Sequence, residues 1–414
     1  CTLAKSADVV LLYLGLDELS ESEGIDRTSL AVPDNQIALL DALHRVNPRI
    51  VVVLSCGSVV EMPWIGKASA VVHGYLSGQA GARALLRVIA GNVNPSGKLA
   101  ETYPMRLEDT PSFRHFPGGQ ATVEYREEPF VGYRYYDSAG VQVLFPFGHG
   151  LSYTSFAYSD MQVSDRAVSF SIENTGAVPG AEVAQLYVGL PESMLFRPAK
   201  ELKGFAKVFL APGEARHIEI PFDDKTFRYF NTRTLSWEVE GGNYQILVGA
   251  SATDVRLKAT LHKVGTGAPN PYQAASLPSY YSADVARVGT DEFARLVGTE
   301  LPSPNWDPKA LLGYNDTLAR CVYARGVLAR LLRHAVGVYH WFLLRTGQRR
   351  KANSLALWVY ALPFRGLARL SGGLISMRMV DAMLSIANGQ LFKGLAELVR
   401  EHRSRKRTTR AAQR

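Results

Sequence analysis

Residues 9–15 read Val9-Val10-Leu11-Leu12-Tyr13-Leu14-Gly15, a short apolar run that ends at glycine. The run begins with β-branched residues and has no polar interruption, which is typical of a strand buried on both faces. Two similar runs follow at 50–54 and 70–75, and stretches with helical periodicity stand at 33–46 and 81–90. This alternation predicts a doubly wound α/β sandwich with a parallel sheet.

Two carboxylates, Glu21 and Glu23, follow the first predicted strand. In an open α/β sheet, ligands bind beyond the carboxyl ends of the strands, which is where we expect this acidic loop. A carboxylate at that edge is well placed for proton transfer. Without further context, however, an acidic loop is more often a set of solvated charges.

The hydrophobic period changes to two beyond residue 155. Residues 168–172 and 217–222 alternate apolar and polar side chains, with turn sequences at 174–176, 211–214 and 240–243. Short alternating strands at this spacing predict an all-β sandwich. The predicted parts are an α/β sandwich at 1–155, a β-sandwich at 156–263, a linker or surface wrap at 264–310, a helical extension at 311–400 and a basic disordered tail at 401–414.

The helical extension has an amphipathic pattern. Apolar residues recur every three or four positions from Leu374 to Leu398, and the apolar runs 335–344 and 355–364 are too short to span a bilayer. Packing on the rest of the protein or on a second subunit is the favoured interpretation. A membrane-surface role is the less favoured alternative, suggested by cations such as Arg365.

The formal net charge of +8 is concentrated near the C-terminus. The last fifteen residues contain Arg400, Arg403, Arg405, Lys406, Arg407, Arg410 and Arg414 against Glu401 alone. A solvated tail is favoured over a contact with nucleic acid or an anionic surface. The three cysteines, Cys1, Cys56 and Cys321, are far apart, and their low number favours a reducing compartment, so we expect a cytoplasmic location.

Several motifs suggest other chemistries and fail on spacing. Gly97-Lys98 precedes Leu99, whereas a phosphate-binding loop needs Ser or Thr there. Ser152 lacks the glycine spacing of a nucleophile elbow, so His149 is interpreted as a turn or core residue. The nine histidines form no cluster with metal-ligand spacing, and no metal is expected.

Five segments stand in a fixed order along the first third of the chain. They are Glu21 to Gln36, Gly74 to Gly81, Gly91-Asn92-Val93-Asn94-Pro95-Ser96-Gly97-Lys98-Leu99, Tyr125 to Tyr136, and Phe145-Pro146-Phe147-Gly148-His149-Gly150-Leu151-Ser152-Tyr153-Thr154. Together they resemble the C-terminal α/β sandwich of glycoside hydrolase family 3, in particular bacterial β-glucosidases. The segment 197–205 resembles the fibronectin type III-like, immunoglobulin-like domain that often follows that sandwich.

The resemblance implies retaining hydrolysis of a β-linked terminal sugar without a cofactor. Glu23, directly before Gly24, matches the general acid/base position, and Glu21 is the alternative in the same loop. In a retaining glycosidase a second carboxylate, ~5–5.5 Å away, attacks the anomeric carbon. The family carries that nucleophile, an Asp, on a separate barrel domain. The sequence has no barrel pattern, so we expect the C-terminal portion of a longer protein.

The expected partners are a β-linked oligosaccharide or glycoside and a barrel domain on the same or another chain; a homo-oligomer is left open. One rival interpretation is a non-catalytic carbohydrate-binding or assembly module, and another is an inactive truncated fragment. Asp26 and Arg27 are interpreted as an ion pair that shapes the loop. Tyr133, Tyr135 and Tyr136 are interpreted as core aromatics rather than a platform for a sugar ring.

Overall fold

The structure, a computed structural model, describes residues 1–22 and 26–412 and contains two compact units. The first unit comprises residues 1–16, 29–118 and 123–302; the second comprises the described parts of 17–28, 119–122 and 303–414. Each unit has its own buried hydrophobic core.

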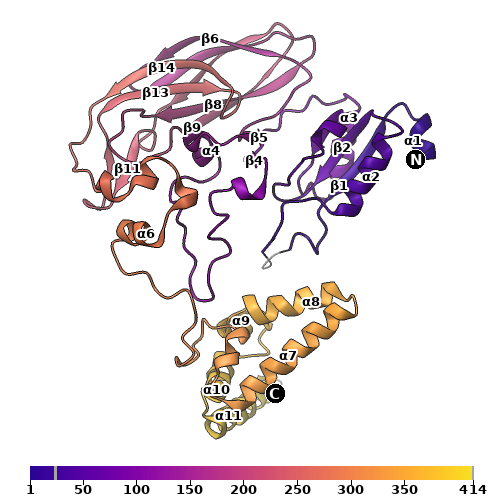
Figure 1. Cartoon of the computed structure of the whole chain (residues 1–414), viewed down its shortest axis with the longest axis vertical. Helices are drawn as coiled ribbons and strands as arrows, with labels where there is room; N and C mark the ends of the chain where they lie inside the picture. The colour runs from indigo at the N-terminus through magenta and orange to yellow at the C-terminus, as the bar shows by residue number, and fades with distance from the viewer. Residues whose placement is uncertain (23–25, 413–414) are drawn as a thin grey trace. The chain divides into compact units, whose positions relative to one another are not determined.

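A parallel sheet opens the first unit. It consists, in spatial order, of β1 (Val10–Gly15), β2 (Ile50–Ser55) and β3 (Ala70–His73). The helices are α1 (Thr2–Ser6), α2 (Asp34–His44), the short η1 (Ile65–Lys67) and α3 (Gly81–Ile89). Figure 1 shows α2 and α3 alongside these strands. The predicted α/β architecture is confirmed, and the strands begin within one residue of their expected positions.

The burial of β1 differs from the sequence-based expectation. Leu12 and Leu14 are buried and pack in one cluster with Leu40 and Leu43 of α2. Val9, Leu11 and Tyr13, on the other face, are 41–54% exposed. The expectation of two buried faces is therefore wrong for the described structure. A continuous apolar run shows that both faces are apolar, but their burial depends on segments distant in sequence.

An irregular stretch with little regular structure links the sheet to the next domain. It contains β4 (Tyr103–Pro104), η2 (Leu107–Asp109), α4 (Tyr133–Ala139) and β5 (Val143–Phe145), and β4 pairs with β5.

A β-sandwich follows at the predicted position. Its strands are β6 (Phe156–Val163), β7 (Ala167–Asn174), β8 (Gly180–Gly189), β9 (Glu201–Leu210), β10 (Ala215–Pro221), β11 (Arg228–Asn231), β12 (Ser236–Val239), β13 (Gly242–Gly249) and β14 (Val255–Lys263). The strands form an antiparallel sheet β10–β7–β6, a second antiparallel sheet β14–β13–β8–β9 and the hairpin β11–β12. Phe170, Leu186 and Ile246 are fully buried between the sheets. The predicted all-β sandwich is confirmed.

The segment expected as a linker contributes to the core of the first unit. It contains η3 (Ala274–Ser276), α5 (Pro278–Tyr281), η4 (Val285–Arg287) and α6 (Thr290–Val297). Tyr280 and Val285 are fully buried in a cluster with Phe130 and Phe196. Residues 274–297 are therefore packed structure rather than an extended connection.

The second unit is helical. Its elements are η5 (Leu318–Tyr323), α7 (Val327–Arg345), α8 (Arg349–Ala356), the π-helical turn η6 (Leu357–Ala361), α9 (Phe364–Leu370), α10 (Met377–Ala387) and α11 (Leu391–Ala412). Its core includes Cys321, Phe364, Val380 and Leu384. None of the helices in the described residues has the length and apolar character needed to cross a membrane.

The helix α11 extends into the segment expected to be a disordered tail. It continues to Ala412, so the backbone of the basic segment is helical up to that residue. Residues 401–412 contain neither Gly nor Pro, and Arg, Lys and Ala all favour the helix. A high positive charge alone therefore does not predict a disordered backbone.

Candidate active site

The start of the acidic loop is held by Gly15 and Gln36. The side-chain amide of Gln36 accepts a hydrogen bond from Gly15 N (2.9 Å) and donates one to Gly15 O (2.9 Å). A Cβ atom on Gly15 would lie 2.2 Å from the carbonyl oxygen of Ser55, so this close approach of β1 to β2 requires glycine. The chain therefore leaves the carboxyl end of β1 at a fixed point.

Asp17 organises the first turn of the loop. Its Oδ1 accepts hydrogen bonds from Leu19 N (3.1 Å), Ser20 N (2.9 Å) and Ser20 Oγ (2.8 Å). The hydrogen bond from the Ser20 hydroxyl is the main cause that lowers the pKa of Asp17. Asp17 is therefore an ionised structural carboxylate. Sequence reasoning missed this role, although Asp three residues before Ser is a turn signal.

Of the two candidate acid/base residues, the structure describes Glu21 but not Glu23. Glu23, with Gly24 and Ile25, lies outside the described residues. Glu21 is half-buried, and its backbone N donates to Asp17 O (2.9 Å). The predicted ion pair of Asp26 and Arg27 is not tested and stays a prediction.

A polar cluster that sequence reasoning missed lies at the carboxyl end of β3. Nδ1 of His73 is 3.3 Å from the carbonyl oxygen of Leu54, and Nε2 is 2.8 Å from the hydroxyl of Tyr103. Because a carbonyl only accepts, Nδ1 carries the proton and Nε2 accepts from Tyr103. Burial lowers the pKa of His73, in agreement with a neutral ring, and burial raises the pKa of the Tyr103 phenol. The pair is suited to positioning rather than to proton transfer near neutrality.

Tyr75 completes this cluster. Its ring centroid lies 3.8 Å from that of His73, and its carbonyl oxygen accepts from Ser55 Oγ (3.2 Å). Tyr75 has φ of 49°, in the left-handed region that a bulky residue rarely adopts. Burial, followed by the charge of Glu101, raises the pKa of its phenol. The strained backbone shows that the surrounding contacts hold the ring in place.

The aromatic segment before β5 is mostly core. Tyr135 and Tyr136 are each 6% exposed in the cluster around Phe130. The hydroxyl of Tyr133 accepts from Leu202 N (2.7 Å) in the β-sandwich. The interpretation of these tyrosines as structural aromatics therefore agrees with their packing.

Two further motif residues have structural roles. Nζ of Lys98 lies 3.2 Å from the carboxylate of Glu182 and 3.2 Å from the carbonyl oxygen of Gly150, so it joins the sheet domain to the β-sandwich. His149 stacks on Phe145 with ring centroids 5.2 Å apart. Among the described residues, no group of three His, Cys, Asp or Glu side chains is arranged to hold a metal ion.

The glycines before α3 act differently from one another. A Cβ on Gly74 would lie 2.9 Å from Leu85 Cδ1 of α3, so Gly74 permits close packing of helix on sheet. Gly78 has open space around it and φ of +66°, so it serves the turn instead.

Comparison with known protein families identifies both N-terminal domains. Residues 1–153 match the glycosyl hydrolase family 3 C-terminal domain, and residues 182–252 match the fibronectin type III-like domain. The chain therefore contains the C-terminal domain of glycosyl hydrolase family 3, followed by a fibronectin type III-like domain.

Curated relatives are longer than this chain. Thermostable beta-glucosidase B of Acetivibrio thermocellus is 50% identical over 266 residues, covering 62% of this chain and 35% of that protein. An exo-alpha-(1->6)-L-arabinopyranosidase of Bifidobacterium breve is 42% identical over 287 residues, covering 68% and 38%. The chain thus spans little more than a third of the length of these relatives.

The solved structures of similar proteins also extend well beyond the part that this chain matches. The Bifidobacterium adolescentis GH3 beta-glucosidase has a TM-score of 0.63 and 44% identity, covering 65% of this chain and 41% of that one. Beta-glucosidase 3B of Thermotoga neapolitana, solved with glucose, has a TM-score of 0.57 and 36% identity, covering 63% and 38%.

Proposed function

We propose that this chain provides the general acid/base of a retaining glycosidase of the β-glucosidase type. The nucleophile would come from a barrel domain on the same or another polypeptide. The observation that carries the proposal is an acidic loop that leaves the carboxyl end of β1 in a family 3 C-terminal domain. Glu23 is the proposed acid/base, and Glu21 is the alternative.

The chemistry requires one carboxyl group to act twice. It first protonates the leaving oxygen while the nucleophile attacks the anomeric carbon, and it then takes a proton from the water that releases the sugar. The contact of Gln36 with Gly15 and the turn around Asp17 support this role, because they limit the conformations at the start of the loop. No cofactor enters this reaction.

The decisive experiment replaces each carboxylate in the native polypeptide that contains this chain. We expect Glu23→Ala to lose most turnover of p-nitrophenyl β-D-glucopyranoside and to regain part of it with azide, which needs no general base. Glu21→Ala is the matched control and should retain activity. The reverse result assigns the role to Glu21. Unchanged turnover in both variants contradicts the proposal.

Glucose is the proposed sugar because several relatives are named beta-glucosidases. An L-arabinopyranoside is the second candidate, since two relatives are named exo-alpha-(1->6)-L-arabinopyranosidase. Comparison of kcat/KM on the two nitrophenyl glycosides separates these substrates.

A non-catalytic binding module is the rival function. Titration of the isolated chain with cellobiose and xylobiose tests it, because tight binding without a barrel is expected only of such a module. A cytoplasmic location is kept as part of our proposal, supported by the finding that Cys1, Cys56 and Cys321 form no disulfide in the described structure. Cell fractionation and a blot against the β-sandwich report both location and polypeptide size.

A further inference from the structure

The helical unit contains a long segment with cations and no anions. From Thr317 to Val380 the sequence has no Asp or Glu. The same segment contains eleven cationic residues, Arg320, Arg325, Arg330, Arg333, Arg345, Arg349, Arg350, Lys351, Arg365, Arg369 and Arg378. Any partner of this surface must therefore tolerate or neutralise a strong positive charge.

Some of these cations are paired within the unit. Arg320, Arg350 and Arg378 form ion pairs with Asp316, Glu18 and Glu401, respectively. Arg330 and Arg345 are exposed and make no ion pair with a carboxylate among the described residues. The guanidinium of Arg345 lies over the ring of Trp341, 5.4 Å from its centroid.

Large apolar side chains are exposed along α7, in the same segment. Leu328, Leu331, Leu332, Val338, Tyr339 and Phe342 are each 50–61% exposed. Their spacings of three, four and seven residues place them on one helical face. Trp341, beside this face, is 57% exposed. The structure therefore leaves uncovered an apolar stripe that the sequence alone would assign to packing.

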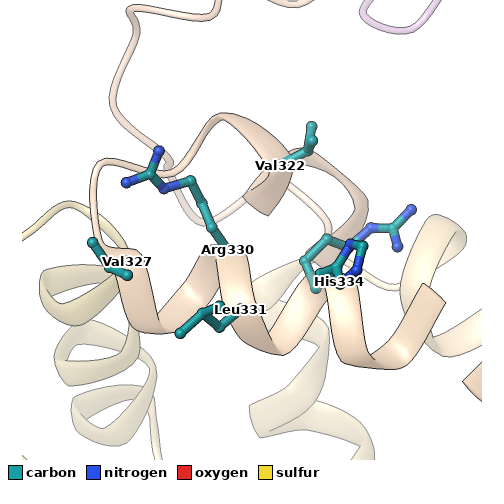
Figure 2. A pocket seen from close by; sticks show the side chains of 6 residues that line it. Val322, Val327, Arg330, Leu331 and His334 are labelled. Carbon is teal, nitrogen blue, oxygen red and sulfur yellow. The ribbon is translucent and has the colours of Figure 1, made fainter. Parts of the chain in front are cut away.

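The start of α7 combines both kinds of side chain around a pocket of about 450 Å³. Figure 2 shows Val327, Arg330, Leu331 and His334 on α7, with Val322 on η5 nearby. Arg333 also lines the pocket, and its Nη2 donates to the hydroxyl of Tyr360 (3.1 Å). The lining is aliphatic and basic, which suits a phosphate group attached to an apolar body.

We propose that α7 lies in the interface of an anionic phospholipid bilayer. Its apolar face would enter the boundary between headgroups and acyl chains, and Arg330, Arg333 and Arg345 would contact lipid phosphates. An exposed apolar face flanked by arginine and aromatic residues is the pattern of interfacial helices. Each cation near an anionic leaflet adds to binding.

Two other occupants fit this surface less well. A second copy of the chain would bring two cation-rich segments without acidic residues against each other, and like charges oppose that association. Nucleic acid would neutralise the cations but would leave Leu331, Leu332 and Phe342 without an apolar partner, because its outer surface is phosphate.

Vesicle sedimentation of the full chain tests the proposal. We expect binding to phosphatidylcholine vesicles that contain phosphatidylserine, little binding to phosphatidylcholine alone, and weaker binding as salt rises. The double variant Arg330→Glu/Arg345→Glu should lower the partition coefficient about tenfold or more. Leu331→Ser/Phe342→Ser should also lower it. The matched controls on α3, Arg83→Glu/Arg87→Glu and Leu86→Ser, should bind as the unchanged chain does.

A second measurement covers the case in which a variant does not fold. Brominated acyl chains should quench tryptophan fluorescence of the unchanged chain, and Trp341→Phe should remove a large part of that quenching. Equal and weak sedimentation with both vesicle types would overturn the proposal. So would binding to single-stranded RNA, or dimer formation in analytical ultracentrifugation, without vesicle binding. None of these binding measurements uses glycosidase activity as its readout, so their outcome does not depend on the proposed function.

Discussion

The hydroxyl of Tyr103 lies 2.8 Å from Nε2 of His73, and this contact joins β4 to the carboxyl end of β3. Tyr103 is 1% exposed and packs in the core of the α/β sandwich. Because His73 uses Nδ1 toward Leu54, Tyr103 supplies the donor for its remaining nitrogen.

Replacement of Tyr103 by Phe should therefore destabilise the first unit. The ring packing remains, but Nε2 of His73 loses its partner inside the protein, which costs ~1–3 kcal/mol of unfolding free energy. Urea unfolding followed by circular dichroism measures this loss. Tyr13→Phe is the control, because Tyr13 is 54% exposed on β1, and we expect a change within about 0.5 kcal/mol. Equal effects of the two variants would contradict a role for the hydrogen bond.

The stability of the first unit should depend on the protonation of His73. Burial holds the pKa of this histidine below its ordinary value of 6.5, so the unfolded chain binds the proton more readily than the folded one. The stability that comes from the neutral ring of His73 is fully present above about pH 6.5, and it is lost as the pH falls through and below that value.

Comparison with the variant His73→Gln isolates the contribution of His73 to the pH dependence of the unfolding free energy. Between pH 7.5 and 5, in roughly the window where histidine titrates, the unchanged chain should lose more unfolding free energy than the variant. His115 and His149 also have pKa values lowered by burial, but they remain in both proteins and cancel in the difference. Parallel pH profiles of the two proteins would show that His73 titrates alike in the folded and unfolded states.

The sequence predicted the parallel sheet and the β-sandwich because the period of the apolar residues is clear in both, whereas β4, η2, α4 and β5 lie in a stretch without such a period and were not predicted. Strands β1 to β3 begin within one residue of the predicted runs, and the β-sandwich occupies the expected range. The helical tail was predicted as helical, but the exposure of α7 was not. Leu331 and Leu332 have the pattern of a packed stripe, and only the fold reveals that nothing in the described part of the unit buries them.

The contacts at the strand ends could not be predicted from spacing. His73 and Tyr103 are 30 residues apart, and Lys98 and Glu182 are 84 apart, with no local signal for either pair. Glu23 is a candidate acid/base residue through the family resemblance alone. Asp17, by contrast, has a local turn signal, because Ser20 follows it by three residues.

The ion pair of Lys98 and Glu182 should be a strong contact between the α/β sandwich and the β-sandwich. Their side chains are only 13% and 6% exposed, and Tyr158 also donates to Glu182 (3.0 Å). Lys98→Met leaves the Glu182 carboxylate without its cation, and such a loss costs ~3–5 kcal/mol.

A double-mutant cycle measures this coupling. We expect Lys98→Met/Glu182→Gln to be less destabilised than the sum of the two single variants, because the second change removes the uncompensated charge. Urea unfolding of the unchanged chain, the two single variants and the double variant gives the four unfolding free energies that the cycle needs. Additive effects would show that the two side chains act independently.

The contact of Gln36 with Gly15 should matter for turnover, if the chain supplies the acid/base as proposed. Gln36→Ala removes both hydrogen bonds that hold the end of β1, so the acidic loop would start from a less defined point. A misplacement of a catalytic group by about 1 Å can cost ~100-fold in rate, and we expect a fall of at least ~10-fold in kcat with a smaller change in KM. Gln162→Ala on β6, where the glutamine is exposed, is the control. Thermal unfolding of both variants separates the two explanations: a lower Tm with unchanged kcat would limit Gln36 to a structural role, whereas a lower kcat at temperatures well below Tm supports its role in positioning the loop.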